Sequence, residues 1–157
     1  MGNQLMRGVI CSFMIFSLCL LAAGCSRLRK GNATSDLRKL QGAWEIQKLE
    51  QDGESAADAS ILKMVIIQDD RFAFRYRLAR SKEDGDLVYH FRLDTSKSPR
   101  QIQLTSPEEG DLAPGIYELD GDTLKICWNR NDKSSVPSDF TCAKGSDRRL
   151  IVLQRAK

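Results

Sequence analysis

The sequence has a single histidine, His90, among its 157 residues. A zinc site built from several histidines is therefore excluded, and a serine–histidine catalytic pair would have to use His90 itself. In the alternating stretch LVYHFRLD, His90 shares the side of Arg92, which we interpret as a solvent-facing strand position. The sequence therefore excludes metal sites that need several histidines, and it leaves His90 alone for histidine-assisted nucleophilic catalysis.

Other signatures of catalysis and cofactor binding are also missing. The chain has no GxGxxG, no phosphate-binding P-loop and no CxxC pair. The acidic stretches at residues 83–86 and 120–122 lack the spaced ligands of an EF-hand loop, and turn chemistry explains both. Nothing local pairs two carboxylates as glycoside hydrolysis requires. We therefore predict no enzyme activity, no metal and no cofactor.

Charge of one sign is not in excess, because 24 basic residues are balanced by 21 acidic ones. Such a balance lacks the electrostatic footprint of a nucleic-acid-binding protein. In RFAFRYRL, residues 71–78, strand parity sends the arginines and the aromatic rings to opposite faces, unlike a base-stacking platform. We interpret the arginines as an outer face, and contact with anionic lipid head groups is the remaining alternative.

A long apolar run is missing as well. Residues 8–23, GVICSFMIFSLCLLAA, are uncharged but lie at the short end of what a spanning helix needs, and with Arg7 before them they have the form of a secretory signal. The residues AAG before Cys25 resemble the lipobox of bacterial lipoproteins, in which the cysteine receives a diacylglycerol and the chain is cut before it. The alternatives are a plain cleaved signal and an uncleaved anchor, which the positive residues at 27, 29 and 30 favour.

These features predict three segments. Residues 1–24 form a lipoprotein signal peptide, and residues 25–39 are the lipidated Cys25 and a flexible linker that ends in about one helical turn. Residues 40–157 form one domain. The expected location is the cell envelope, on the exported side of the membrane, where acyl chains hold a monomer.

From residue 43 onward, apolar residues alternate and turn residues recur every 8 to 12 positions, which is typical of an all-β sandwich or barrel. We expect about eight strands. The stretch GIYELDGDTLKICW gives the strongest hairpin signal, because Asp120-Gly121 suits a type I′ turn between two alternating runs. Successive hairpins predict an antiparallel up-and-down barrel, wide enough for packed side chains or one small ligand.

Four stretches point to a family by their order and spacing: LQGAWEIQKLEQDG, FRLDTSKSPRQIQLT, GIYELDGDTLKICW and RLIVLQR. The first resembles the Gly-x-Trp opening of lipocalins, and together, over residues 40–155, they are similar to a planctomycete lipocalin-like domain of unknown function. The resemblance implies an exported, often lipidated β-barrel and supplies no catalytic or ligand-contacting residue. Tyr89 replaces a glycine usual in that family, which predicts a fuller barrel, and Gln103 replaces a common aspartate.

Two hypotheses about function remain. In the first, the barrel binds a small, partly apolar molecule with its inward-facing side chains. In the second, the same side chains fill the barrel, which serves as a structural or interaction module of the envelope. The predicted inward set consists of Trp44, Ile46, Phe72, Phe74, Tyr76, Tyr89, Phe91, Tyr117, Leu119, Ile126 and Trp128.

Two of the five cysteines leave with the signal peptide, and Cys25 takes the lipid. Cys127 and Cys142 then remain near the last hairpin, in a compartment where disulfides form. The parity of Cys127 with Lys125 places its side chain outside the barrel. A surface disulfide between Cys127 and Cys142, or two free thiols, are the alternatives.

Overall fold

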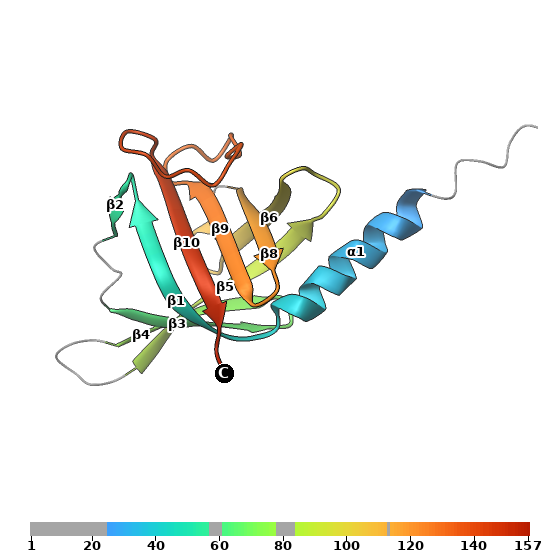
Figure 1. Cartoon of the computed structure of the whole chain (residues 1–157), viewed down its shortest axis with the longest axis horizontal. Coiled ribbons are helices and arrows are strands. Elements are labelled where there is room, and N and C mark those ends of the chain that lie inside the picture. The colour runs from blue at the N-terminus through green and yellow to red at the C-terminus, as the bar shows by residue number, and fades with distance from the viewer. Residues whose placement is uncertain (1–24, 57–60, 78–83, 113) are drawn as a thin grey trace, which may run out of the picture.

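The computed structural model describes residues 25–56, 61–77, 84–112 and 114–157, with side chains from residue 33 onward. The described residues form one helix, α1 (Cys25–Leu40), and ten strands (Figure 1). The strands are β1 (Gly42–Gln51), β2 (Glu54–Ser55), β3 (Leu62–Gln68), β4 (Arg71–Arg77), β5 (Asp84–Asp94), β6 (Arg100–Ser106), β7 (Gly110–Asp111), β8 (Gly115–Asp120), β9 (Thr123–Asn129) and β10 (Arg148–Arg155). The predicted signal peptide and the side chain of Cys25 lie outside this description.

Eight of these strands close into an antiparallel barrel. Each pairs with the next along the chain in the order β1, β3, β4, β5, β6, β8, β9, β10, and β10 then pairs with β1. The two-residue strands β2 and β7 pair with β1 and β6 beside this circuit. The prediction of an all-β, up-and-down barrel of about eight strands is therefore confirmed, and closure leaves no open edge on the barrel.

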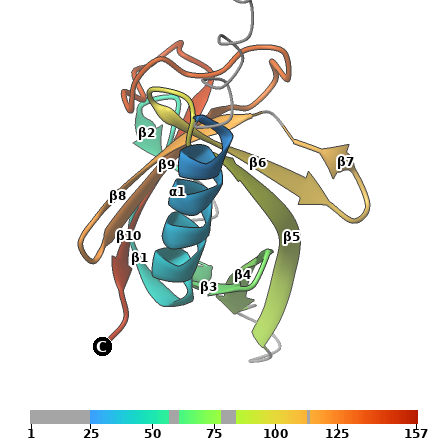
Figure 2. The same cartoon turned by 90° about the vertical axis from the view of Figure 1, so that its right-hand side faces the viewer.

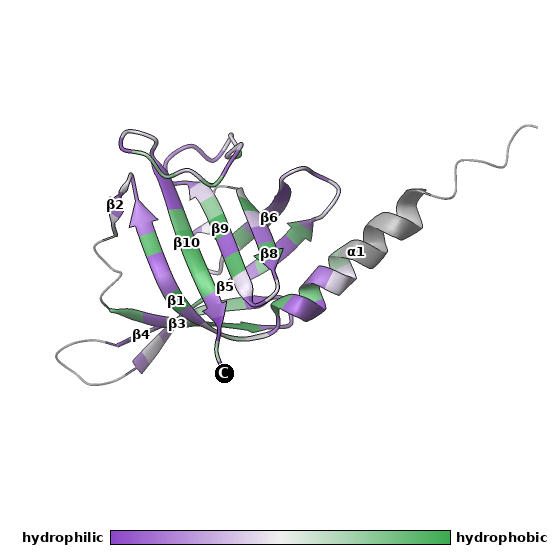
Figure 3. Cartoon of the chain, in the orientation of Figure 1, coloured by the Kyte–Doolittle hydropathy of each residue, from purple (hydrophilic) through white to green (hydrophobic). Residues whose placement is uncertain are grey.

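Apolar and polar residues alternate along the strands (Figure 3), and the apolar side chains form the core. One side chain of each successive pair points inward, where apolar residues from all eight barrel strands form one cluster. The largest fully buried members of this inner cluster are Trp44, Tyr117 and Phe72. Phe72 contacts Phe74 and Phe91 edge to face, with ring centroids 5.1 and 6.4 Å apart. Aromatic packing thus fills much of the interior.

A β-bulge in β1 changes which residues face inward. The register of β1 against β10 shifts between Ile46 and Lys48, so the residues after the bulge exchange faces. As a result Leu49, which has the opposite parity to Trp44, is also buried in the core. Strict alternation from Trp44 would have placed Leu49 in solvent.

Two tight turns have different backbone conformations. Gly121 and Asp122 connect β8 to β9, and of these two only Gly121 has a positive φ, 55°. The hairpin predicted here is confirmed, but positive φ at the first central residue alone matches type II′ rather than type I′. Positive φ at both central residues occurs instead at Asp52 and Gly53, between β1 and β2.

A second apolar cluster lies outside the barrel wall. Ile116, Cys127 and Leu150 point outward from three neighbouring strands and are buried beneath the connection formed by residues 130–147. Val136, Phe140 and Cys142 of that connection, with Val152 of β10, pack against them. This cover explains why β8, β9 and β10 carry apolar residues on both faces.

Helix α1 ends against the barrel, and its N-terminal part extends away from it (Figures 1 and 2). Leu37 and Leu40 pack against the inner cluster, and the Trp44 indole nitrogen donates to the Leu40 carbonyl at 2.8 Å. The Arg155 guanidinium donates to the carbonyls of Lys39 and Gln41 and lies over the Trp44 ring. These contacts satisfy carbonyls at the end of α1 and close this end of the barrel.

The helix covers all of the segment in which we expected a flexible linker and one helical turn. Its polar sequence offers little apolar surface, but Arg38 and Lys39 lie in the last turn, where positive charge complements the helix dipole. Docking of the last turn adds the tertiary contacts that a linker would lack. Among the described residues, no helix is long and apolar enough to cross a bilayer.

Candidate functional site

The barrel end opposite α1, which we call the open end, contains an apolar cavity of about 120 Å³. Its walls come from β1, β3, β4, β5, β6, β9, β10 and the residue after β7. The lining residues are Leu49, Leu62, Phe74, Leu87, Tyr89, Leu104, Leu112, Trp128 and Arg149. Except for one guanidinium, the charged groups of the strands are kept out of this space.

The volume of the cavity limits what it can hold. Ligand pockets in proteins usually span about 300–1,000 Å³, whereas a dry cavity of about 150 Å³ holds one benzene. The open-end cavity therefore accommodates a small apolar group, such as the end of a longer molecule. Most of the remaining barrel interior is occupied by side chains of the inner cluster.

Arg149 is the charged member of the cavity wall. It has the same parity as Ile151 and Leu153, which belong to the inner cluster, and it pairs with Trp128 across β9 and β10. Its side chain therefore lies on the inner face of the strand, at the level where β10 begins. A molecule in the cavity would therefore lie close to this guanidinium.

The rim of the open end carries exposed apolar side chains. Leu87 of β5 is 50% exposed and Ile61, which precedes β3, is 36% exposed. Leu87 also lines the cavity, so apolar surface continues from the cavity to the outside. The rim can therefore contact an apolar group that extends beyond the cavity.

The predicted inward set divides into several groups. Phe74, Tyr89 and Trp128 line the open-end cavity. Tyr76 instead covers Gly85, where an added Cβ would lie 2.5 Å from the tyrosine oxygen. The other residues of the predicted set pack in or against the inner cluster, namely Trp44, Ile46, Phe72, Phe91, Tyr117, Leu119 and Ile126.

Six of the residues that line the cavity lie outside the predicted inward set. Leu62, Leu87, Leu104 and Leu112 are leucines, whereas the predicted set emphasised aromatic rings. Leu49 was hidden by the bulge in β1. The inward position of Arg149 could not be predicted, because β10 is apolar on both faces and its sequence does not show which face is the inner one.

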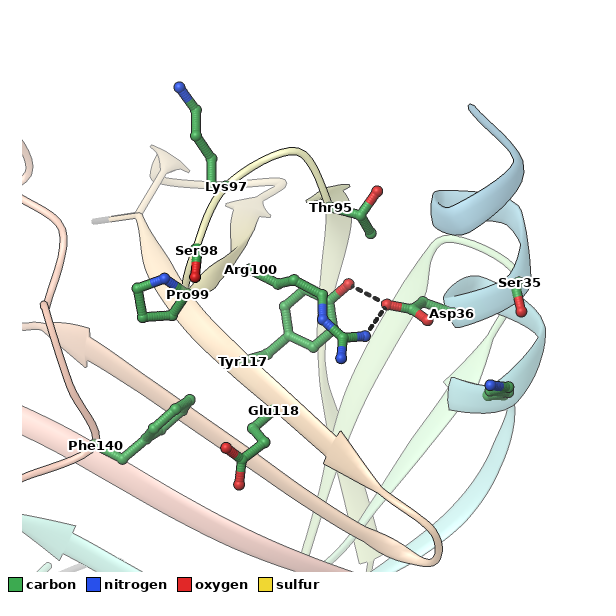
Figure 4. A pocket seen from close by; sticks show the side chains of 11 residues that line it. Ser35, Asp36, Thr95, Lys97, Ser98, Pro99, Arg100, Tyr117, Glu118 and Phe140 are labelled. Atoms are coloured by element: carbon green, nitrogen blue, oxygen red, sulfur yellow. Dashed lines mark hydrogen bonds and ion pairs between the residues drawn. The ribbon is translucent and has the colours of Figure 1, made fainter. Parts of the chain in front are cut away.

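A second candidate site lies beside α1, where three polar side chains meet (Figure 4). Arg100 Nη1 donates to Asp36 Oδ2 at 2.6 Å, and the Tyr117 hydroxyl donates to the same oxygen at 2.7 Å. The Asp36 side chain is 10% exposed and that of Arg100 is 40% exposed. The trio joins α1 to the first residue of β6 and the middle of β8.

Burial and charge raise the pKa of two members of this trio, Tyr117 and Arg100. Burial raises the pKa of Tyr117 above its ordinary value of 10, and the neighbouring Asp36 carboxylate raises it further. The hydrogen bond to Asp36 raises the pKa of Arg100. Tyr117 thus stays a neutral donor and Arg100 a cation, so one negative oxygen accepts both hydrogen bonds.

The trio forms one wall of a groove of about 500 Å³ between α1, the β5–β6 connection and β8 (Figure 4). Exposed Lys39 and Lys97 lie at its edge. The complete lining is Ser35, Asp36, Lys39, Thr95, Lys97, Ser98, Pro99, Arg100, Tyr117, Glu118 and Phe140. Unlike the open-end cavity, this groove is mainly polar.

The outer arginines of β4 face carboxylates on β5. Arg75 bonds to Asp86 and Arg77 to Asp84 through two nitrogens each, with the shorter distances at 3.0 and 2.8 Å. Both arginines and both aspartates are at least partly exposed. Two of the three arginines expected on this outer face are thus paired with acidic partners, which weakens the case for anionic lipid as their target.

His90 and the acidic stretches have ordinary surroundings. His90 is exposed on the outer face, and its Nδ1 lies 3.1 Å from Asp70 Oδ2. Asp122 of the β8–β9 turn pairs with Arg155 at 3.0 Å. In the part of the chain that the structure describes, no group of three or more histidine, cysteine, aspartate or glutamate residues is arranged to hold a metal.

Cys127 and Cys142 lie in the same outer cluster and are free thiols in this structure. Cys127 is fully buried, and this burial raises its pKa to about 11. The Cys142 thiol donates to the Arg148 carbonyl at 3.2 Å. The outward direction expected for Cys127 is confirmed, while the disulfide between the two residues stays a prediction.

The chain matches no protein-family model, no curated protein and no solved structure. Its barrel is established by its own strand pairing, and its likeness to a planctomycete lipocalin-like domain stays an expectation.

Proposed function

We propose that this protein is an exported lipoprotein, anchored through Cys25 in the cell envelope, whose barrel binds the apolar end of a small amphipathic molecule. The apolar cavity at the open end carries this proposal. The signal-like residues 1–24 and the lipobox-like AAGC support export and anchoring. No step of catalysis is involved.

The energetics favour a ligand that uses more than the cavity. Burying about four methylene groups contributes about 3 kcal/mol, which corresponds by itself to a dissociation constant above 1 mM. Additional affinity has to come from the rim, where Leu87 and Ile61 are exposed, and from the charge of Arg149. These contacts favour a short-chain or medium-chain molecule with an anionic group.

Photo-crosslinking of the full-length protein in vesicles tests this function. A diazirine-bearing octanoate should label peptides from the cavity wall, and the matching octanamide should label them less because it lacks the charge that Arg149 attracts. Leu112→Phe should reduce labelling by narrowing the cavity. Leu119→Phe, which adds the same ring at the other end of the barrel, is the matched control.

Two results would contradict the proposal. Labelling that is spread over the surface, and is equal in Leu112→Phe and Leu119→Phe, would mean that the cavity takes no such ligand. Full membrane retention of a Cys25→Ala variant would contradict the lipid anchor.

The alternative function is a filled barrel that serves as a structural or interaction module of the envelope. The dense aromatic packing of the inner cluster favours it, as does the small volume left at the open end. In that case the exposed Leu87 and Ile61 would contact a protein partner. Crosslinking from a photoreactive residue at position 87 to a single envelope protein, without octanoate labelling, would support this alternative.

A further inference from the structure

We propose that the groove beside α1 is a second binding site, specific for a sugar acid, meaning a monosaccharide unit that carries a carboxylate. The groove lies at the opposite end of the barrel from the apolar cavity and is built from different strands. This site therefore does not depend on the function proposed above.

The first argument is charge. The groove lining has three basic side chains, Lys39, Lys97 and Arg100, against two acidic ones, Asp36 and Glu118. Arg100 balances Asp36 at 2.6 Å, and Lys125 balances Glu118 at 2.9 Å, so the two lysines remain as positive charge in excess. The lysines at the edge are exposed, so the groove as a whole attracts an anion.

The second argument is the fixed position of Arg100. Its Nη1 is held by Asp36 at 2.6 Å, and its guanidinium lies 5.7 Å from the centre of the Tyr117 ring. The side chain is nevertheless 40% exposed. A guanidinium positioned in this way can direct its remaining N–H groups to a planar carboxylate without losing much side-chain freedom.

The third argument separates a sugar acid from a simple anion. Pro99 and Phe140 add apolar surface on one side of the groove, while Ser35 and Ser98 bring hydroxyl groups (Figure 4). A sugar ring presents apolar C–H faces together with hydroxyl groups, so it matches both kinds of surface. The volume of about 500 Å³ is within the usual range for small-molecule sites and is large enough for a monosaccharide.

Calorimetric titration of the full-length protein in detergent micelles tests the site with three probes: galacturonate, neutral galactose and inorganic phosphate. We expect galacturonate to bind most tightly. Lys97→Ala and Lys39→Ala should each weaken it by up to about fivefold at low salt, since exposed charge contacts are modest. Lys144→Ala removes an exposed lysine outside the groove and should change nothing. Added salt should weaken binding of galacturonate.

Phe140→Leu tests contact with the sugar ring separately from contact with the carboxylate. The substitution keeps apolar volume in the outer cluster but removes the flat ring. It should weaken galacturonate binding while thermal stability stays close to that of the wild type. Equal affinity for phosphate and galacturonate would overturn the proposal in favour of a general anion site. Absence of galacturonate binding at millimolar concentration, or equal loss in Lys97→Ala and Lys144→Ala, would overturn it altogether, and the Asp36–Arg100–Tyr117 trio would then serve only to attach α1.

Discussion

At the closed end of the barrel, where α1 docks, two-residue turns connect β3 to β4 and β8 to β9, and polar side chains hold α1 against the strands. The open end has longer connections and an apolar cavity. Arg155 illustrates the closed end, because it contacts two carbonyls at the end of α1, the Trp44 ring and Asp122. At the open end, Leu87 remains half exposed. The contrast indicates that the closed end is fixed by side-chain contacts to α1, whereas the open end leaves apolar surface accessible.

Replacing one tryptophan at each end should give the largest difference in the free energy of unfolding. Trp44→Ala should lower the free energy of unfolding by about 3–5 kcal/mol, because Trp44 is fully buried and its indole nitrogen is hydrogen-bonded. Trp128→Ala should cost clearly less, since Trp128 is partly exposed beside an existing cavity. Urea unfolding measures both, and equal losses would contradict the contrast between the two ends.

The polar trio gives the next largest effect. Asp36→Asn removes the charge that Arg100 and Tyr117 share and should cost about 1–2 kcal/mol, in the lower part of the usual range because Arg100 is partly exposed. Asp86→Asn, which breaks the exposed pair with Arg75, is the control and should have a much smaller effect. Urea unfolding again provides the measurement. If the two variants lost equal stability, the trio would be no more than a surface ion pair.

The sequence predicted the barrel well because most of its strands alternate and so have one apolar face. The strand that contains Phe72 and Phe74 follows this rule, and both residues are buried where parity placed them. Parity failed at Leu49, where the bulge inserts a residue, and at Arg149, where the outer face of β10 is also covered. Both failures reflect tertiary structure that a period-two pattern does not encode.

The groove could not be predicted for a different reason. Asp36 is separated from Arg100 by 64 residues and from Tyr117 by 81, so no local motif contains the trio. In the sequence, Asp36 belongs to a polar segment that is typical of a linker. Its importance comes only from the docking of α1 on β6 and β8.

Acid should loosen the connection between β9 and β10 that flanks the open end. Hydrogen bonds from Thr141 lower the pKa of Asp139 to about 2, and those from Ser134 and Ser135 do the same for Asp132. Because these pKa values lie below the ordinary 3.8, the stabilisation is complete above about pH 4 and is lost as the pH falls through about 2.

The reactivity of the Cys142 thiol reports this loosening. Cys142 lies in the same connection, so its reaction with dithiodipyridine, a reagent that also works in acid, should accelerate between about pH 4 and pH 2. In the Asp139→Asn variant, Cys142 should react faster already at neutral pH, because a neutral amide oxygen accepts weaker hydrogen bonds than a carboxylate. Tryptophan fluorescence provides the control for global unfolding. A reaction rate that does not change until the whole protein unfolds would contradict the expected local opening.

The smallest effect on stability is expected at the rim. Leu87→Gln should change the free energy of unfolding by less than about 0.5 kcal/mol, because half of the leucine side chain is already in water. The same substitution should reduce the fluorescence of the dye ANS, which binds exposed apolar surface. Gln68→Leu, an exposed position in β3 near the closed end, is the reciprocal variant, and it should leave ANS binding at the open end unchanged. If Leu87→Gln destabilised the protein strongly, the rim would be part of the core, and the open end would have the same structural role as the closed end.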